Sequence, residues 1–281
     1  MNQIFQCITC HSSFDDGCEG EYTCQNCGEL YEIADGYIKT HFDKKLFEHF
    51  RKDYLLNKTL NNNGFISYQL LQEASISLQD REDVTRFRSF LERHLNGKRI
   101  LDIGCGIMAT PGYLQFSTPR FHDLIGLDPI DDNNFRGLRI VGCSEFVPLM
   151  DGSVDNIVFA TSMDHVCNLR KTIAEASRLL DREGRVLVWM SDRSATPIER
   201  VKDWLRRRIR SWKLGYSVDK YYVYPNWTVL GVPSGGVDPF HSYLETPKKI
   251  IALFANAGMR LCSEERHSKV EIFLAFEKVP G

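Results

Sequence analysis

From residue 98 onward, short apolar runs of strand length alternate with stretches that have helical spacing. The strand-like runs read RILDIG, DLIGLDP, LRIVG, VDNIVFA and GRVLVWMSD, and the helical stretch LRKTIAEASRLLD precedes the last of them. Because a crossover helix returns the chain so that the next strand runs parallel, this alternation predicts an α/β fold with a doubly wound, mostly parallel sheet. Such sheets bind their ligands at the carboxyl ends of the strands.

The C-terminal part predicts a helix over 246–258 and then two more strands, MRLCSEERH and KVEIFLAFEKV. Since no helix separates these two strands, they should form a hairpin in which the last strand runs antiparallel. Together with the five preceding runs, they predict a seven-stranded sheet with an antiparallel last strand.

Composition bounds the partners of this domain. The chain has 281 residues, 43% hydrophobic and 26% charged, which suits one main domain with a small addition. Its formal net charge of -2 favours neither nucleic acid nor an anionic membrane as a bulk partner. The start of the chain lacks the basic and apolar parts of a secretory signal, and no apolar run approaches the roughly 18 residues of a membrane helix. We therefore expect a cytoplasmic protein without a transmembrane segment.

Four of the nine cysteines form two CxxC pairs, Cys7 with Cys10 and Cys24 with Cys27. Thiolates at this spacing converge on one ion, and four sulfurs complete the tetrahedral shell that zinc prefers. Disulfides are disfavoured in a reducing cytosol, and a redox CxxC needs thioredoxin-like surroundings. Because four ligands leave no open position for substrate, residues 1–40 are expected to be a ribbon with a structural zinc ion.

The same segment continues into a hairpin pattern, in which Tyr31 and Ile38 flank a turn at Asp35 and Gly36. The order CxxC, CxxC and Y-x-I-x-D-G-x-I resembles the small zinc-ribbon family of methyltransferase activators, which also occurs fused in front of methyltransferases. Up to Lys39 the segment has seven acidic residues and a single lysine, so it would repel a phosphate backbone. A protein partner for the ribbon stays open.

Residues 41–97 carry two helical patterns, FDKKLFEHFRKDYLL and DVTRFRSFLERHL, and we expect NNNG at 61–64 to separate them. The second pattern places an apolar stripe at Val84, Phe87, Phe90 and Leu91. This extension is predicted to pack against the main domain or to cover its site, rather than to carry the chemistry.

The loop after the first strand of the main domain, GCGIMA, fits the glycine fingerprint of dinucleotide sites, but Asp102 stands two residues before Gly104. A carboxylate beside a pyrophosphate would be costly, whereas it pairs well with the ammonium group of S-adenosylmethionine. Asp102 therefore favours S-adenosylmethionine as the cofactor. Asp128 follows at about the distance expected for a residue that binds the ribose.

From Lys98 to Trp189 the sequence resembles class I S-adenosylmethionine-dependent methyltransferases of the ubiquinone and menaquinone biosynthesis type. The resemblance rests on ILDIGCG, IGLDP, GCSEFVPLMDGSVDNIVFATSMDHV and EASRLLDREGRVLVW. It implies a Rossmann-like methyltransferase domain over 98–281. The residues that it implies at the cofactor are Asp102, Gly104, Cys105, Gly106, Asp128, Pro129, Cys143, Ser144, Glu145 and Thr161.

Two positions depart from the pattern of that family. Met108 stands where a third glycine is frequent, which a flexible side chain tolerates. Cys143 stands where an acidic residue often accepts a hydrogen bond from the adenine amino group. Its absence costs on the order of 1 kcal/mol unless Ser144 or the backbone replaces it.

His165, in MDHV after the fourth strand of the domain, is the first candidate for a general base or substrate contact, and His241 is the second. A histidine that caps the following helix is the alternative for His165. An insertion at about 194–243 contains the basic amphipathic stretch ERVKDWLRRRIRSWK and the aromatic stretch YSVDKYYVYPNW. The resemblance implies that it overhangs the site as a substrate lid, and the alternative is a solvated helix on the sheet rim.

Three functions follow from these features. The leading one is methyl transfer to a small or lipid-linked metabolite, and an anionic one would match the arginines of the insertion. The second is a ribosomal-RNA base methyltransferase, because certain enzymes that methylate guanine in ribosomal RNA also have a zinc ribbon before this fold; the acidic ribbon argues against it. The third is a catalytically silent scaffold that binds a partner through the ribbon.

Overall fold

The computed structural model describes residues 4–14, 19–73, 81–116, 123–132, 134–192, 221–224, 227–231, 245–267 and 271–279. The helical elements are α1 (Phe42–Glu73), α2 (Glu82–His94), the short turn η2 (Gly112–Leu114), α3 (Leu169–Leu179) and α5 (Pro247–Asn256). The strands are β1 (Gly20–Thr23), β2 (Leu30–Ala34), β3 (Tyr37–Thr40), β4 (Arg99–Ile103), β5 (Asp123–Asp128), β6 (Leu138–Val141), β7 (Val154–Ala160), β8 (Leu180–Ser191), β9 (Tyr221–Tyr224), β10 (Trp227–Gly231), β11 (Met259–Arg266) and β12 (Glu271–Lys278).

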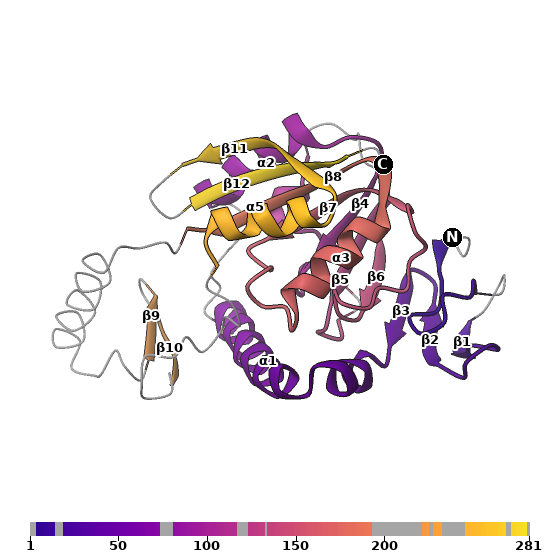
Figure 1. The fold of residues 1–281 in the computed structure, drawn as a ribbon. Helices are drawn as coiled ribbons and strands as arrows, with labels where there is room; N and C mark the ends of the chain where they lie inside the picture. Colours follow the sequence, from indigo (N-terminus) through magenta and orange to yellow (C-terminus); the bar gives the residue numbers. More distant parts are fainter. Residues whose placement is uncertain are drawn as a thin grey trace.

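One sheet of ten strands runs through the molecule in the order β1-β2-β3-β6-β5-β4-β7-β8-β12-β11 (Figure 1). Strands β6, β5, β4, β7 and β8 pair in parallel, and β12 is antiparallel to both β8 and β11. The seven strands from β6 to β11 therefore confirm the predicted doubly wound sheet with an antiparallel last strand.

The other three strands come from the ribbon. Strands β2 and β3 form the predicted hairpin around Asp35 and Gly36, and Gly36 has a φ of 67° that suits glycine. Strand β3 then pairs in parallel with β6, with Tyr37 opposite Arg139. The ribbon thus covers an edge of the main sheet whose backbone groups would otherwise lack partners.

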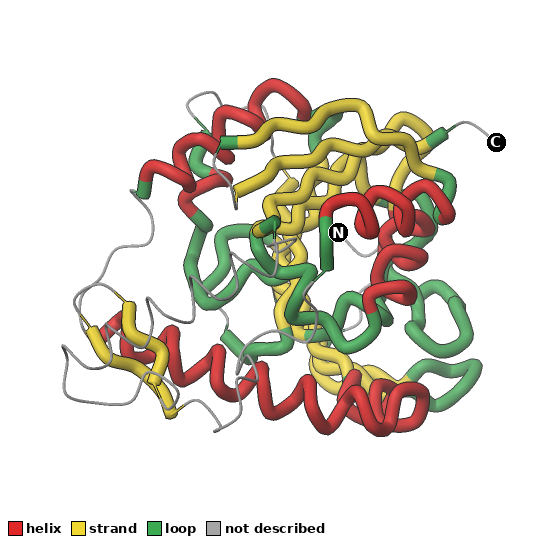
Figure 2. Tube along the Cα trace, turned by 60° about the vertical axis from the view of Figure 1, so that its left-hand side comes forward, coloured by secondary structure: helices red, strands yellow, loops and turns green. Residues whose placement is uncertain are grey.

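Helices lie on both sides of the sheet (Figure 2). Side chains alternate along β4, so Leu101 and Ile103 join the apolar cluster that contains α3 and α5 residues, whereas Ile100 joins the cluster under α2. The stripe Val84, Phe87, Phe90 and Leu91 of α2 is buried as predicted. Asp102 is two residues from Ile100, so its side chain points to the same face of the sheet, the one covered by α2.

Helix α1 corrects one expectation. It continues through residues 61–64, where NNNG was expected to break it, and its non-helical residue is Phe50 (φ -130°, ψ 24°). A glycine in a helix costs only about 1 kcal/mol, which tertiary contacts readily offset. Two side chains anchor the middle of α1, since Tyr54 is buried and Asn57 Nδ2 donates to the backbone oxygen of His165.

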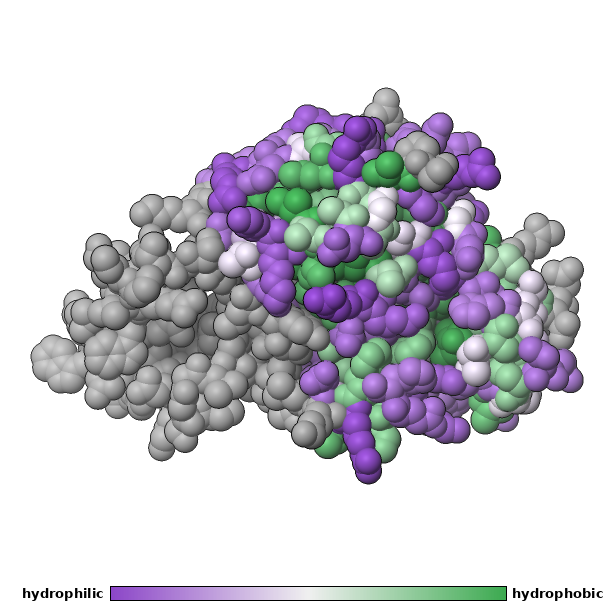
Figure 3. Space-filling view, in the orientation of Figure 1, coloured by the Kyte–Doolittle hydropathy of each residue, from purple (hydrophilic) through white to green (hydrophobic). Residues whose placement is uncertain are grey.

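Most of the insertion, including its basic stretch and His241, lies outside the described residues. Within the insertion, the structure describes the backbone of the hairpin that β9 and β10 form. Among the described residues, no helix has the length and apolar character needed to span a membrane. The described surface in Figure 3 mixes hydrophilic and hydrophobic residues.

Candidate functional site

Asp102 lies at the carboxyl end of the central strand β4 and is fully buried. Its Oδ2 accepts a hydrogen bond from the Tyr113 hydroxyl (2.9 Å), while Oδ1 has no partner within the described part of the chain. Burial is the main reason why the pKa of Asp102 rises to about 7, and the nearby charge of Asp128 raises it further. The structure thus holds a buried carboxylate with one oxygen available to a cationic group.

The glycine loop after β4 is pressed against the loop after β7. Gly104 has a φ of 82°, and a Cβ at this position would lie 2.4 Å from Ser162 Cβ. The Gly104 N–H donates to the oxygen of Leu127 at the end of β5 (2.8 Å). A side chain at Gly104 would be strained and would clash, so glycine is required here by geometry.

Asp128 ends β5 and is held by the backbone on both sides. Its Oδ2 accepts from the Gly106 N–H (2.9 Å), and its Oδ1 accepts from the Ile130 N–H (3.0 Å). Burial raises its pKa, which these bonds and the charge of Arg139 oppose. Pro129 follows directly and is half-buried. The two carboxylates predicted at the cofactor, Asp102 and Asp128, are therefore brought to one edge of the sheet.

Residues 143–145 also lie at this edge, but two of their side chains face α3. The Ser144 hydroxyl is 2.8 Å from Thr172 Oγ1, and Glu145 Oε1 accepts from the N–H of Asn168 (2.7 Å) at the N-cap of α3. Cys143 is buried. Ser144 is one candidate to replace the acidic residue that is absent at Cys143, but its hydroxyl is already bonded to Thr172.

The loop after β7 brings Thr161 and His165 near the glycine loop. Thr161 is exposed and has a φ of 58°, a conformation that costs energy for a non-glycine residue. The half-buried imidazole of His165 has its Nε2 3.7 Å from an Asp164 carboxylate oxygen. The N–H of His165 donates to the backbone oxygen of Ser162 (3.0 Å), and its own backbone oxygen accepts from Asn57. The second predicted histidine, His241, lies outside the described residues.

The four CxxC cysteines form a cluster in the ribbon. Their sulfurs all lie within 4.8 Å of one another, with Cys7 and Cys27 at 3.4 Å and Cys10 and Cys24 at 3.5 Å. A tetrahedron of sulfurs around zinc, with bonds of about 2.3 Å, has edges of about 3.8 Å. The Tyr31 hydroxyl donates to Cys7 Sγ (3.1 Å), as an outer-shell partner of a metal ligand would. The donor set and its spacing fit a zinc ion.

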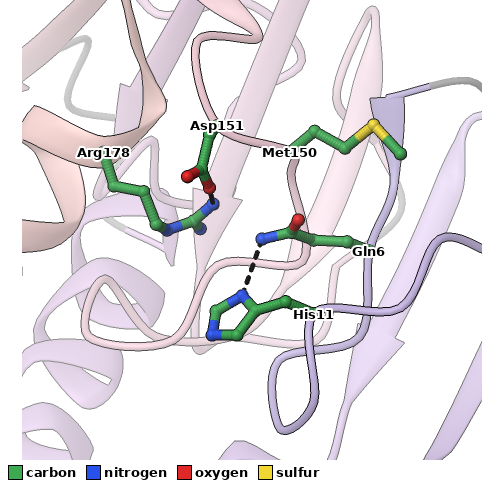
Figure 4. A pocket seen from close by; sticks show the side chains of 5 residues that line it. All are labelled: Gln6, His11, Met150, Asp151 and Arg178. Carbon is green, nitrogen blue, oxygen red and sulfur yellow. Dashed lines mark hydrogen bonds and ion pairs between the residues drawn. The ribbon is translucent and has the colours of Figure 1, made fainter. Parts of the chain in front are cut away.

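A separate cavity of about 410 Å³ opens between the ribbon and the main domain. Gln6, His11, Met150, Asp151 and Arg178 line it (Figure 4). The guanidinium of Arg178 is engaged by Asp151 and by the backbone oxygens of residues 147 and 149, so it is not available to an anion. The cavity holds none of the predicted cofactor residues.

Two side chains at the site escaped the sequence analysis. Tyr113, which bonds Asp102, comes from η2 in a stretch without a motif. Arg139 is fully buried in β6 beside the glycine loop. The sequence did contain a signal for Arg139, since it stands between Leu138 and Ile140 in an apolar strand. A charge buried in a strand needs buried partners, which indicates a polar site beside it.

The charges at this edge favour a cationic ligand. Asp102, Asp128 and Arg139 carry a net charge of about -1 when all are ionised, and the carboxylates disfavour a pyrophosphate. The unpartnered oxygen of Asp102 leaves an acceptor for a cationic group, and the sequence predicts the ammonium group of S-adenosylmethionine at this residue.

The comparisons with known proteins concern the main domain. Residues 101–188 match the family model described as a methyltransferase domain. No curated protein matches the chain. Among solved structures of similar fold, the (4+2)-cyclase SpnF shares 11% identity at a TM-score of 0.52, over 79% of this chain and 97% of SpnF.

Two similar structures carry methyltransferase names. The 1,6-didemethyltoxoflavin-N1-methyltransferase of Burkholderia thailandensis, with 1,6-didemethyltoxoflavin and S-adenosylhomocysteine bound, shares 12% identity at a TM-score of 0.48, over 92% of this chain and 99% of that one. An S-adenosylmethionine-dependent methyltransferase from Aquifex aeolicus shares 14% identity at a TM-score of 0.47, over 72% of this chain and 95% of that one. Residues 101–188 therefore carry a methyltransferase domain, within a chain whose mostly parallel sheet is Rossmann-like.

Proposed function

We propose that this enzyme transfers the methyl group of S-adenosylmethionine to a small or lipid-linked metabolite, and that it is of the ubiquinone and menaquinone biosynthesis type. The observation that carries the cofactor proposal is the buried Asp102 carboxylate, with Oδ1 unpartnered among the described residues. When bound, the cofactor supplies an electrophilic methyl group on a sulfonium. In this proposal Asp102 pairs with the ammonium group and Asp128 binds the ribose hydroxyls.

The chain's own residues would orient the reactants. Gly104 lets the glycine loop pack against Ser162. We place Cys143, Ser144 and Glu145 along the adenine, and the Ser144 and Glu145 side chains there bond to α3 and its N-cap. His165 is held at the carboxyl end of β7 by its own backbone bonds. We assign to His165 the role of general base, for a nucleophile that must lose a proton, or of substrate contact.

A metabolite is favoured over RNA by the acidic ribbon. Glu21, Glu32 and Asp35 are exposed on a ribbon that is fixed to the edge of the sheet. Their charges would repel a phosphate backbone that approached this side. Retention on RNA at low and physiological salt tests this choice. Tight retention at physiological salt would support the ribosomal-RNA alternative instead.

We further propose that Cys7, Cys10, Cys24 and Cys27 bind one structural zinc ion. The cluster geometry supports this, and a closed four-sulfur shell leaves no position for substrate. Metal analysis of the purified protein should find one zinc per chain, and Cys10→Ser should lower this content. A full zinc content in Cys10→Ser would remove Cys10 from the ligand set.

Calorimetry with S-adenosylmethionine tests the cofactor proposal directly. The wild-type protein should bind it, and Asp102→Asn should bind about 10- to 100-fold more weakly, because a charge-assisted hydrogen bond is lost. Asp155→Asn is a matched control, since Asp155 accepts from the N–H groups of Lys98 and Arg99 at the opposite end of β4. A wild-type protein that binds no cofactor would support the scaffold alternative.

A further inference from the structure

Arg139 is the only lysine or arginine that is fully buried among the described residues. It lies in β6 opposite Gly126 of β5, where the absence of a side chain leaves space for Cys105 Sγ and the ring of Phe135. A buried guanidinium is costly unless several acceptors and an opposite charge surround it. Its partners therefore indicate what its position serves.

The guanidinium of Arg139 bonds to the two peptide segments that also hold Asp128. Its Nη1 donates to the Gly106 oxygen (2.9 Å), and its Nη2 donates to the Ile130 oxygen (2.6 Å). Asp128 accepts from the N–H groups of these same two residues. Arg139 thus binds the carbonyl oxygens of Gly106 and Ile130, and Asp128 binds their N–H groups. Together they hold the glycine loop and the turn after β5.

The charge of Arg139 acts on this acidic site as well. It lowers the pKa values of Asp102 and Asp128 against the effect of burial. The other titratable groups that face Asp128 are Asp102 and Cys105 on the β4 side, and His165 after β7. Without Arg139, two buried carboxylates would face each other with no fixed cation between the strands.

We propose that Arg139 is a positioning residue for the cofactor: by holding Gly106 and Ile130 and balancing the charge of Asp128, it presets the ribose-binding side of the site. This inference rests on the proposed binding of S-adenosylmethionine. Arg139 need not touch the cofactor, because it acts through Asp128 and the two loops. Its removal should weaken binding and should make the affinity fall more steeply as the pH is lowered.

Calorimetry with S-adenosylmethionine between about pH 6 and about pH 7.5, a range that brackets the Asp102 pKa of about 7, tests the proposal in folded variants. Arg139→Met should bind about 10- to 100-fold more weakly than wild type, with a steeper loss of affinity toward low pH. Arg139→Lys keeps the charge but not both hydrogen bonds, so it should restore the wild-type pH profile and only part of the affinity. Arg185→Met is the matched control, because Arg185 donates to the backbone oxygen of His94 away from the site.

A double-mutant cycle with Asp128→Asn separates positioning from general support. If Arg139 acts through Asp128, the double variant should bind no more weakly than the weaker single variant, whereas additive losses would overturn the proposal. If Arg139→Met does not fold, the same cycle is run with Arg139→Lys. A folded Arg139 variant with wild-type affinity and pH profile would also overturn it. Failure of the wild type to bind would instead contradict the proposed function.

Discussion

Because the pKa of Asp102 is raised, Asp102→Asn should increase the stability of the protein and weaken its binding of the cofactor. In the folded chain without cofactor this pKa is about 7, against an ordinary value of 3.8, because the carboxylate is buried. Between these values the unfolded chain has lost the proton that the folded chain retains, so stability falls as the pH rises from about 4 to 7. The difference between these two pKa values corresponds to roughly 4 kcal/mol at pH 7, as an upper bound.

Asp102→Asn should therefore be more stable than wild type at pH 7, by up to about 4 kcal/mol, since the amide has no charge to desolvate. The gain should shrink toward pH 5, where the wild-type carboxyl is largely protonated when folded. Urea unfolding at the two pH values measures both quantities. A variant that is less stable than wild type at pH 7 would refute the assignment of a raised pKa.

Binding should respond in the other direction. In the proposed site the ammonium group pairs with ionised Asp102, so wild-type affinity should increase about fivefold between pH 6 and pH 7, as the ionised fraction rises to about half. Asp102→Asn should bind weakly, and this increase should be absent. Calorimetry in two buffers of different ionisation enthalpy should also detect proton release by the wild type. The same pH dependence in both proteins would show that another group titrates.

The remaining predictions concern the loops and the ribbon. Gly104→Ala should lose about 1–3 kcal/mol of stability together with cofactor affinity, as measured by unfolding and calorimetry, because its Cβ would meet Ser162; unchanged values would contradict the geometry. His165→Gln should lower turnover by ~100-fold with little change in cofactor affinity, and unchanged turnover would remove it as a base. If zinc fills the ribbon site as proposed, its removal by a chelator should lower the melting temperature and weaken cofactor binding, since Tyr37 and Lys39 of the ribbon bond Asp131 in the loop after β5; unaltered binding would show that cofactor binding does not depend on the ribbon.

The sequence by itself determined most of the local elements. Alternating apolar runs predicted β7 at its observed bounds, and the Asp35-Gly36 turn predicted the ribbon hairpin. Periodicity and turn chemistry act over a few residues, so they are readable without a structure. The position of Asp102 beside a glycine loop likewise followed from a single strand and the turn after it.

The tertiary structure alone decided how these parts combine. It joined β3 to β6 across about one hundred residues of sequence, and it turned Ser144 toward α3. It also closed the network of Arg139 and Asp128 through Gly106 and Ile130. Long-range strand pairing and buried charge networks depend on which segments meet in space, and no local pattern records that, because the partners are contributed by distant parts of the chain.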